Sequence, residues 1–285
     1  MIEVERLCHD YEGKGVLAVD DVSFRAEPGT IYGFLGPSGA GKSTVQNILT
    51  GLLPLQRGSA ALLGQAVTSL RPSFFNRVGY SFELPNLFGA LTGYENLAYF
   101  AGLFAVPTED PMRLLERVGL AAAAGKRVST YSKGMKQRLL FLRAILNRPE
   151  VLFLDEPESG LDPTTSLVIK DMIREQRDRG ATILLTTHNM YAADELCDRV
   201  AFMDKGRILA EGRPRELKLR YGERVAAVEY RDGNELRSER IALDGEAGRA
   251  RLAELASSGR IETMHSMEAS LEAIFIRLTG RKLSA

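Results

Sequence analysis

Residues 31–52 read IYGFLGPSGAGKSTVQNILTGL, and this stretch decides the fold. A short apolar segment, 31–35, precedes a glycine-rich loop, and apolar residues at helical spacing follow the loop. The order predicts a strand, a loop and a helix. Glycines allow the loop backbone to curl so that its N–H groups point inward, and the positive end of the helix dipole points to the same place. We therefore expect a site for a triphosphate.

The residues of this loop have distinct expected roles. In a GxxxxGK[ST] loop the lysine bridges the β- and γ-phosphates, and the next hydroxyl ligates Mg²⁺. We assign these roles to Lys42 and Ser43, and contact with the α-phosphate side to Thr44. A glycine-rich turn without a ligand is the alternative, but the flanking strand and helix patterns argue against it. The predicted ATP-binding loop comprises Gly36, Pro37, Ser38, Gly39, Ala40, Gly41, Lys42, Ser43 and Thr44.

An acidic pair follows a second apolar segment. Residues 151–154 form a continuous apolar run, which is typical of a central parallel strand, and Asp155 and Glu156 come directly after it. Parallel sheets bind ligands at the carboxyl ends of their strands. We expect Asp155 to hold Mg²⁺ directly or through water, and Glu156 to polarise the attacking water. The alternative for Glu156 is a charge at a helix N-terminus.

A third apolar segment, ATILLTTHNM (181–190), predicts a strand that ends at His188. A single histidine at a strand end is usually structural. Two other strand ends already carry the phosphate loop and the carboxylates, so we predict that His188 contacts the γ-phosphate and positions the attacking water. The predicted catalytic residues are therefore Lys42, Glu156 and His188.

The order of these motifs resembles the ATP-binding cassette (ABC) ATPases, the nucleotide-binding subunits of ABC transporters. Residues 36–44 look like Walker A, YSKGMKQR (131–138) like the signature, VLFLDEP (151–157) like Walker B, SGLD (159–162) like the D-loop with Asp162, and TTH (186–188) like the switch histidine. The resemblance covers about residues 2–215 and implies ATP and Mg²⁺ as cofactors. A kinase or GTPase would share only the phosphate loop and the Walker B acid.

The resemblance assigns two further positions. Tyr11 lies 25 residues before Gly36, where family members have an aromatic ring that stacks on adenine; an unrelated surface tyrosine is the alternative. Glu83 stands where the family has a glutamine that reaches Mg²⁺ and the attacking water. A carboxylate can still ligate Mg²⁺, but it adds negative charge near the triphosphate. We therefore expect slower and more Mg²⁺-dependent hydrolysis than glutamine would support.

The signature departs from the usual leucine, serine, glycine, glycine, glutamine. Tyr131, Lys133 and Met135 replace three of these residues, while Ser132 and Gly134 remain. A serine hydroxyl and backbone N–H groups at a helix start can still reach a γ-phosphate, and Lys133 adds positive charge. We interpret the segment as a working variant, with a degraded, non-hydrolysing site as the alternative. The resemblance implies a homodimer in which Ser132, Lys133 and Gly134 contact the ATP of the partner subunit.

The composition bears on which kinds of partner the protein binds and on where it works. The 285 residues contain 37 Lys+Arg and 37 Asp+Glu, so no net basic field favours nucleic acid or anionic lipid. Cys8 and Cys197 have no CxxC spacing, which favours free thiols in a reduced, cytosolic protein. The charged N-terminus does not resemble an export signal, and the best apolar run, 138–146, is short and contains Arg143. Membrane spans would have to come from another chain.

These patterns predict an α/β fold, a P-loop NTPase of the ABC cassette type with a mixed sheet core. We expect the ATPase domain at 1–213, with a helical subdomain at about 84–146, and a small α+β appendage at 214–285. The appendage should contain a hairpin around Asp232 and Gly233, a helix at 246–257, a strand at 260–266 and a helix within 268–280. The last helix carries an apolar stripe, which is more often core than a partner interface: Leu271, Ile274, Phe275 and Leu278. Both a packing role and a regulatory or dimerisation role stay open for the appendage.

The resemblance implies an ATP-hydrolysing subunit of an ABC exporter, peripheral on the cytoplasmic face of the cell membrane and paired with a separate integral-membrane permease. Substrate choice belongs to the permease; small hydrophobic drugs are favoured, and lipids, polysaccharides and haem-related compounds stay open. The rival class is a soluble ABC ATPase that acts on nucleic acid or ribosomes. Such proteins usually carry tandem cassettes, long coiled coils or basic arms, and none is visible in the sequence.

Overall fold

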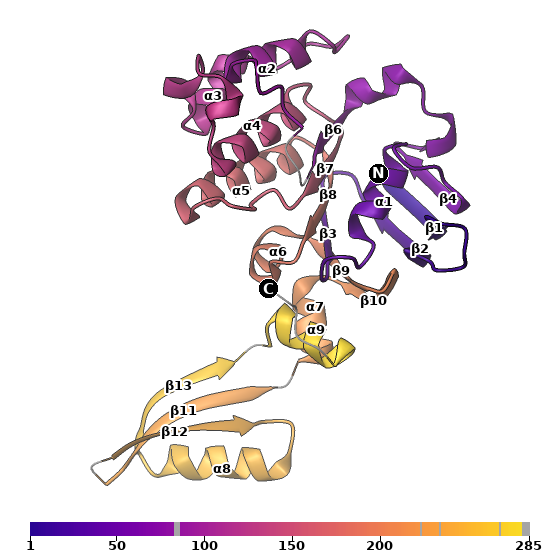
Figure 1. Cartoon of the computed structure of the whole chain (residues 1–285). Helices are drawn as coiled ribbons and strands as arrows, with labels where there is room; N and C mark the ends of the chain where they lie inside the picture. Colours follow the sequence, from indigo (N-terminus) through magenta and orange to yellow (C-terminus); the bar gives the residue numbers. More distant parts are fainter. Residues whose placement is uncertain (83–85, 223, 234, 268, 281–285) are drawn as a thin grey trace. The chain divides into compact units, whose positions relative to one another are not determined.

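The computed structural model describes residues 1–82, 86–222, 224–233, 235–267 and 269–280. It contains two compact units, Met1–Glu211 and the chain from Gly212 onward, and each is described by itself (Figure 1). No helix in the described ranges is both long and apolar enough to cross a membrane.

The first unit is organised around a six-stranded sheet in the order β10-β9-β3-β8-β7-β6. Strand β8 lies between β3 and β7 and is parallel to both, so the carboxyl ends of these three strands meet at one edge. All three strands are buried along their whole length, which explains their continuous apolar runs. The strands are β3 (Ile31–Leu35), β6 (Val78–Ser81), β7 (Val151–Asp155), β8 (Thr182–Thr187), β9 (Arg199–Asp204) and β10 (Arg207–Gly212). The three strands predicted from the sequence are confirmed to within one residue.

A second, antiparallel sheet has the order β2-β1-β4-β5. It comprises β1 (Ile2–His9), β2 (Val19–Ala26), β4 (Arg57–Leu62) and β5 (Gln65–Ala66). Burial alternates along most of β2, as expected when one face of a strand contacts a core. One apolar cluster joins this sheet to β3, β7 and helix α1 (Lys42–Leu49) through residues such as Val22, Phe34, Ile48 and Phe153. This packing joins α1, the helix that follows the phosphate loop, to both sheets.

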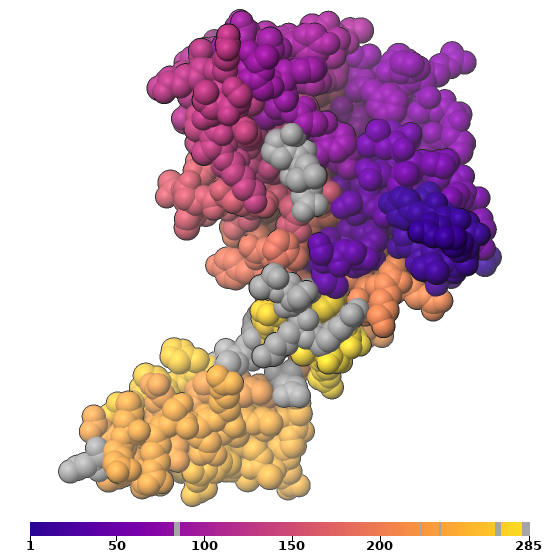
Figure 2. Space-filling view, in the orientation of Figure 1, coloured from indigo at the N-terminus to yellow at the C-terminus, as the bar shows by residue number. Residues whose placement is uncertain are grey.

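The helical segment of the first unit contains the predicted helices. They are α2 (Gly93–Ala101), α3 (Pro111–Arg117) and α4 (Lys133–Ile145). A reciprocal capping box between Thr92 and Glu95 starts α2, which explains why the helix begins there. Two further helices, α5 (Pro163–Asp178) and α6 (Met190–Leu196), follow β7 and β8. In the space-filling view, the magenta helical segment and the indigo N-terminal strands form separate surface regions of this unit (Figure 2).

The second unit has a three-stranded antiparallel sheet in the order β12-β11-β13, with a small core that includes Val228, Tyr230, Ile241 and Leu255. Its elements are α7 (Pro214–Tyr221), β11 (Val225–Asp232), β12 (Glu235–Ala242), α8 (Glu246–Ser257), β13 (Ile261–Met267) and α9 (Leu271–Thr279). The predicted helix at 246–257 is confirmed at both ends. The short helix α7 is absent from the sequence-based prediction.

Two details of this unit refine the prediction. Strands β11 and β12 pair antiparallel and Asp232 pairs with Glu235, so the predicted hairpin is confirmed and Asp232 is the last residue of its first strand. On α9, the stripe residues Leu271, Ile274 and Phe275 are buried and Leu278 is partly exposed, in agreement with a core role.

Candidate functional site

Two glycines of the phosphate loop are required by close backbone approach. A Cβ atom on Gly36 would lie 2.1 Å from the carbonyl oxygen of Met203, and one on Gly41 would lie 2.5 Å from that of Ala18. Gly41 also has a φ of 101° and caps α1, a conformation that other residues rarely adopt. The loop backbone therefore packs tightly against two other segments of the same chain, at Ala18 and Met203, before α1 begins at Lys42.

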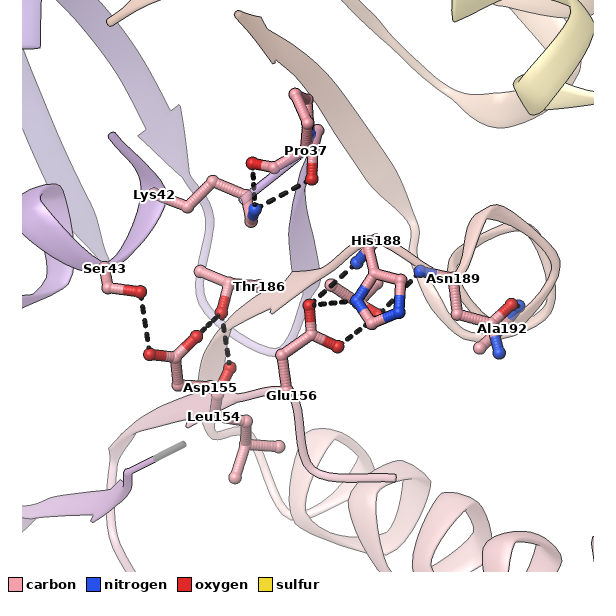
Figure 3. A network of polar contacts seen from close by, with 12 residues as sticks. Pro37, Lys42, Ser43, Leu154, Asp155, Glu156, Thr186, His188, Asn189 and Ala192 are labelled. Atoms are coloured by element: carbon pink, nitrogen blue, oxygen red, sulfur yellow. Dashed lines mark hydrogen bonds and ion pairs between the residues drawn. The ribbon is translucent and has the colours of Figure 1, made fainter. Parts of the chain in front are cut away.

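The side chain of Lys42 lies over this loop. Its Nζ donates hydrogen bonds to the carbonyl oxygens of Gly36 at 2.8 Å and Pro37 at 2.9 Å, and the residue is only 7% exposed (Figure 3). A buried ammonium group beside a curled loop supplies positive charge where phosphate oxygens would bind. This position agrees with the expected contact to the β- and γ-phosphates.

Ser43 on α1 and Asp155 at the carboxyl end of β7 are joined by a hydrogen bond. Ser43 Oγ donates a 2.8 Å hydrogen bond to Asp155 Oδ2, and Thr186 donates to Oδ1 of the same carboxylate (Figure 3). The described part of the chain contains no group of three or more His, Cys, Asp or Glu residues that could hold a metal ion. A hydroxyl and a carboxylate are hard oxygen donors that suit Mg²⁺, which usually takes its other ligands from substrate phosphates and water. The donor set fits Mg²⁺ bound together with a nucleotide.

Glu156 and His188 form a close pair at the ends of β7 and β8. Glu156 Oε1 accepts from the backbone N–H of His188 at 2.9 Å and lies 2.7 Å from its Nδ1, while Thr187 Oγ1 donates to Oε2 at 3.1 Å (Figure 3). The Glu156 side chain is 14% exposed and the imidazole 62%. Helix α5 begins only at Pro163, so Glu156 is not the N-terminal charge of a helix. The carboxylate is instead oriented toward the histidine.

The backbone of Glu156 is held on both sides. Its φ is +47°, in the left-handed region that is uncommon for a side chain of this kind. Its N–H donates to the carbonyl oxygen of Thr186 at 3.0 Å, and Gln137 Nε2 donates to its carbonyl oxygen at 3.2 Å. Since Gln137 lies on α4, the helix that carries the predicted signature also fixes the predicted catalytic carboxylate.

Tyr11 follows strand β1 of the antiparallel sheet and reaches the same loop. Its hydroxyl lies 3.0 Å from Thr44 Oγ1, and its ring packs edge to face on His9 at a centroid distance of 4.8 Å. The residue is 59% exposed, so a ring face is accessible to a planar ligand. This contact with the phosphate loop favours the adenine-stacking role over an unrelated surface tyrosine.

The signature residues lie beside the D-loop. Ser132 caps α4 and accepts from the backbone N–H of Met135 at 3.2 Å, and a Cβ on Gly134 would lie 3.1 Å from the carbonyl oxygen of Gly160. Asp162 caps α5 through Thr165, whose hydroxyl and backbone N–H donate to its carboxylate at 2.6 and 3.0 Å. These hydrogen bonds lower the pKa of Asp162. The predicted metal ligand Glu83 lies outside the described residues.

Comparison with known proteins identifies the family. A family model described as ABC transporter matches residues 19–159. The chain is 48% identical over 285 residues to a fluoroquinolones export ATP-binding protein of Mycobacterium tuberculosis, an alignment that covers 100% of this chain and 95% of the relative. The chain belongs to the ABC transporter family. The cassette is also 36% identical over 300 residues to the Nod factor export ATP-binding protein I of Burkholderia thailandensis, with 99% of this chain and 98% of that protein covered.

A solved structure supports the same assignment. The cassette resembles an ATP-binding subunit of an ABC transporter with a TM-score of 0.71 at 29% identity, over 78% of this chain and 93% of that one. The predicted P-loop cassette fold is therefore confirmed. The chain is an ATP-binding subunit of the ABC exporter type and an ATPase, and such a subunit works with a membrane partner. The alternative of a soluble ABC ATPase for nucleic acid or ribosomes is not supported.

Sequence reasoning missed three residues around the cassette's carboxylates: Gln137, Thr186 and Thr187. The two threonines directly precede His188, which was a signal for both, but the register that pairs Asp155 with Thr186 is set by the sheet. Gln137 gave no comparable signal, since its contact with Glu156 depends on how α4 packs against the sheet.

Proposed function

We propose that this ABC ATPase binds and hydrolyses Mg²⁺-ATP as a homodimer on the cytoplasmic face of the cell membrane, and thereby drives export of a drug-like small molecule through a separate integral-membrane permease. The observation that supports the hydrolytic role is the contact between Glu156 and His188. Glu156 directly follows Asp155, which accepts a hydrogen bond from Ser43. The export role and the drug-like substrate are supported by the 48% identical relative, whose name specifies fluoroquinolones.

In this proposal, the chain's own groups bind and orient the reacting atoms. The loop N–H groups and Lys42 bind the β- and γ-phosphates, and Tyr11 stacks on adenine. Ser43 and Asp155 hold Mg²⁺, which supplies charge neutralisation at the phosphates when it is bound. Glu156 accepts a hydrogen bond from the attacking water and takes its proton during in-line attack. His188 is oriented by Glu156 at Nδ1, which leaves Nε2 for the γ-phosphate.

The homodimer completes each site in the proposal. Ser132 stands at the N-terminus of α4, a 13-residue helix whose dipole favours anions at that end. Lys133 adds charge at the same end, and Gly134 leaves the backbone accessible. We place this helix end on the γ-phosphate held by the partner subunit, so that ATP joins the two subunits and its hydrolysis releases them.

Reconstitution tests the proposal. The cassette is purified together with the membrane protein that co-purifies with it, inserted into vesicles, and assayed for Mg²⁺-ATP hydrolysis and for uptake of a fluoroquinolone into inverted vesicles. We expect the drug to stimulate hydrolysis and ATP to drive uptake, with Glu156→Gln inactive in both assays. Recovery of the chain with ribosomes or DNA instead of the membrane protein would exclude the exporter role. Hydrolysis without drug stimulation or uptake would exclude this substrate class.

A further inference from the structure

A buried lysine contacts the two chain segments that follow the predicted catalytic pair. Lys170 on α5 has a side chain that is 7% exposed, and its Nζ lies 2.7 Å from Glu195 Oε2 and 3.8 Å from Glu158 Oε1. It also lies over the ring of Tyr191, 5.8 Å from the centroid. A nearly buried lysine is uncommon, and one that contacts three other groups is held in a single arrangement.

The partners of Lys170 belong to two functional segments. Glu158 lies two residues after Glu156, in the segment that leads to Asp162. Glu195 and Tyr191 lie on α6, which starts directly after His188, with Asn189 as its cap (Figure 3). Lys170 therefore connects the chain that follows the catalytic carboxylate to the helix that follows the switch histidine.

Glu158 depends on this lysine. Its side chain is 15% exposed, and its Oε1 is buried without a hydrogen bond to any described residue. Burial raises the pKa of Glu158, and the negative charges of Glu195 and Glu156 act in the same direction, whereas Lys170 and a hydrogen bond from Ser166 lower it. A buried carboxylate that loses its cation is strongly destabilised.

We infer that Lys170 is a positioning residue for ATP hydrolysis, which holds the segment after Glu156 against the helix after His188 and so keeps the carboxylate of Glu156 on the imidazole. The inference rests on the proposed roles of Glu156 and His188. Without the ammonium group, Glu158 and Glu195 repel each other, and the segment at 157–161 moves toward solvent. A small displacement of Glu156 then costs turnover more than it costs ATP binding, because the phosphate loop lies on different elements.

The expected result separates this role from simple packing. In steady-state assays of the full chain with Mg²⁺-ATP, Lys170→Met should lower kcat by about ten- to a hundredfold and change KM by no more than about twofold. The double variant Lys170→Met with Glu158→Gln should recover most of the lost kcat, because no unpaired carboxylate remains. Arg174→Met is the matched control, since Arg174 also bonds Glu195, at 2.6 Å, but lies nearer the surface; it should keep the wild-type kcat.

Two outcomes would overturn the inference: an unchanged kcat in Lys170→Met, or a double variant no more active than the single one. If Lys170→Met does not fold, Lys170→Gln replaces it, because glutamine can still bond Glu195 but carries no charge for Glu158. Glu156→Gln distinguishes the inference from the proposed function. Wild-type hydrolysis by Glu156→Gln would refute the role of Glu156 itself, whereas an inactive Glu156→Gln beside a fully active Lys170→Met would refute only the role of Lys170.

Discussion

Glu156 and His188 are joined through one carboxylate oxygen: Glu156 Oε1 accepts from the His188 backbone N–H at 2.9 Å and lies 2.7 Å from the ring Nδ1. The two residues are 32 positions apart in the chain and end neighbouring parallel strands. The backbone contact fixes the carboxylate, and the ring contact fixes the imidazole. The proposed general base and the proposed phosphate ligand therefore orient each other.

Replacement of Glu156 by glutamine should abolish turnover but keep ATP binding. The amide has nearly the same shape but cannot take a proton from water, and general base catalysis contributes about 10²- to 10⁴-fold to a rate. We therefore expect kcat to fall by at least about a hundredfold, measured as phosphate release. Glu175→Gln is the control: Glu175 on α5 has a 44% exposed side chain that pairs with Arg117, and the variant should hydrolyse ATP normally. Loss of ATP binding in Glu156→Gln would mean that the residue is structural.

Replacement of Ser43 by alanine should raise the Mg²⁺ concentration that hydrolysis requires. Ser43 Oγ contributes a hard oxygen ligand and the hydrogen bond to Asp155, and alanine removes both. We expect the Mg²⁺ concentration at half-maximal hydrolysis to rise by about tenfold, as for loss of one ligand contact. Ser59→Ala, at an exposed serine on β4 outside the loop, is the control. An unchanged Mg²⁺ requirement in Ser43→Ala would assign the metal to other residues.

The strands and their functional ends could be predicted from the sequence because parallel strands buried on both faces are continuous apolar runs, and polar residues mark where each run stops. Thr186 was overlooked because the register that places it beside Asp155 depends on strand pairing, and apolar patterns leave such pairing undetermined. The contacts of Lys170 and Gln137 depend on how α5 and α4 pack, because their partners Glu195 and Glu156 lie 25 and 19 residues away in the sequence. Short helix α7, rich in charged residues, lacks the apolar periodicity that revealed α8 and α9.

Replacement of Ser132 by alanine should suppress hydrolysis while the isolated subunit still binds ATP. Ser132 caps α4 through Met135 N–H, so its loss also costs about 1 kcal/mol of helix stability. Ser132→Thr, which keeps a capping hydroxyl, separates the two effects and should retain part of the activity. ATP binding by the subunit is measured by calorimetry at concentrations below dimer formation. Loss of binding under those conditions would show that Ser132 does not act on a partner's nucleotide.

Replacement of Tyr11 should reveal how much the ring contributes to nucleotide affinity. Tyr11→Leu removes the ring, and stacking of a base on an aromatic side chain contributes about 1–3 kcal/mol, so the Kd for ATP should rise by about five- to a hundredfold. Tyr11→Phe removes only the hydroxyl that lies 3.0 Å from Thr44 Oγ1 and should bind nearly as well as the wild type. Equal losses in the two variants would attribute affinity to the hydroxyl instead of the ring.

Replacement of Glu83 by glutamine should accelerate hydrolysis and reduce its Mg²⁺ dependence. The resemblance predicts glutamine at this position, and a carboxylate there would add a negative charge near the triphosphate that Lys42 and Mg²⁺ must offset. Removal of one like charge at about 4 Å is worth about 1 kcal/mol in bulk water and about 4 kcal/mol at an effective dielectric constant near 20, so kcat should rise severalfold or more at low Mg²⁺. The effect should shrink as Mg²⁺ approaches saturation, because bound Mg²⁺ already neutralises the site. Steady-state rates across a Mg²⁺ titration of both proteins measure this, and identical curves would show that the glutamate does not face the nucleotide.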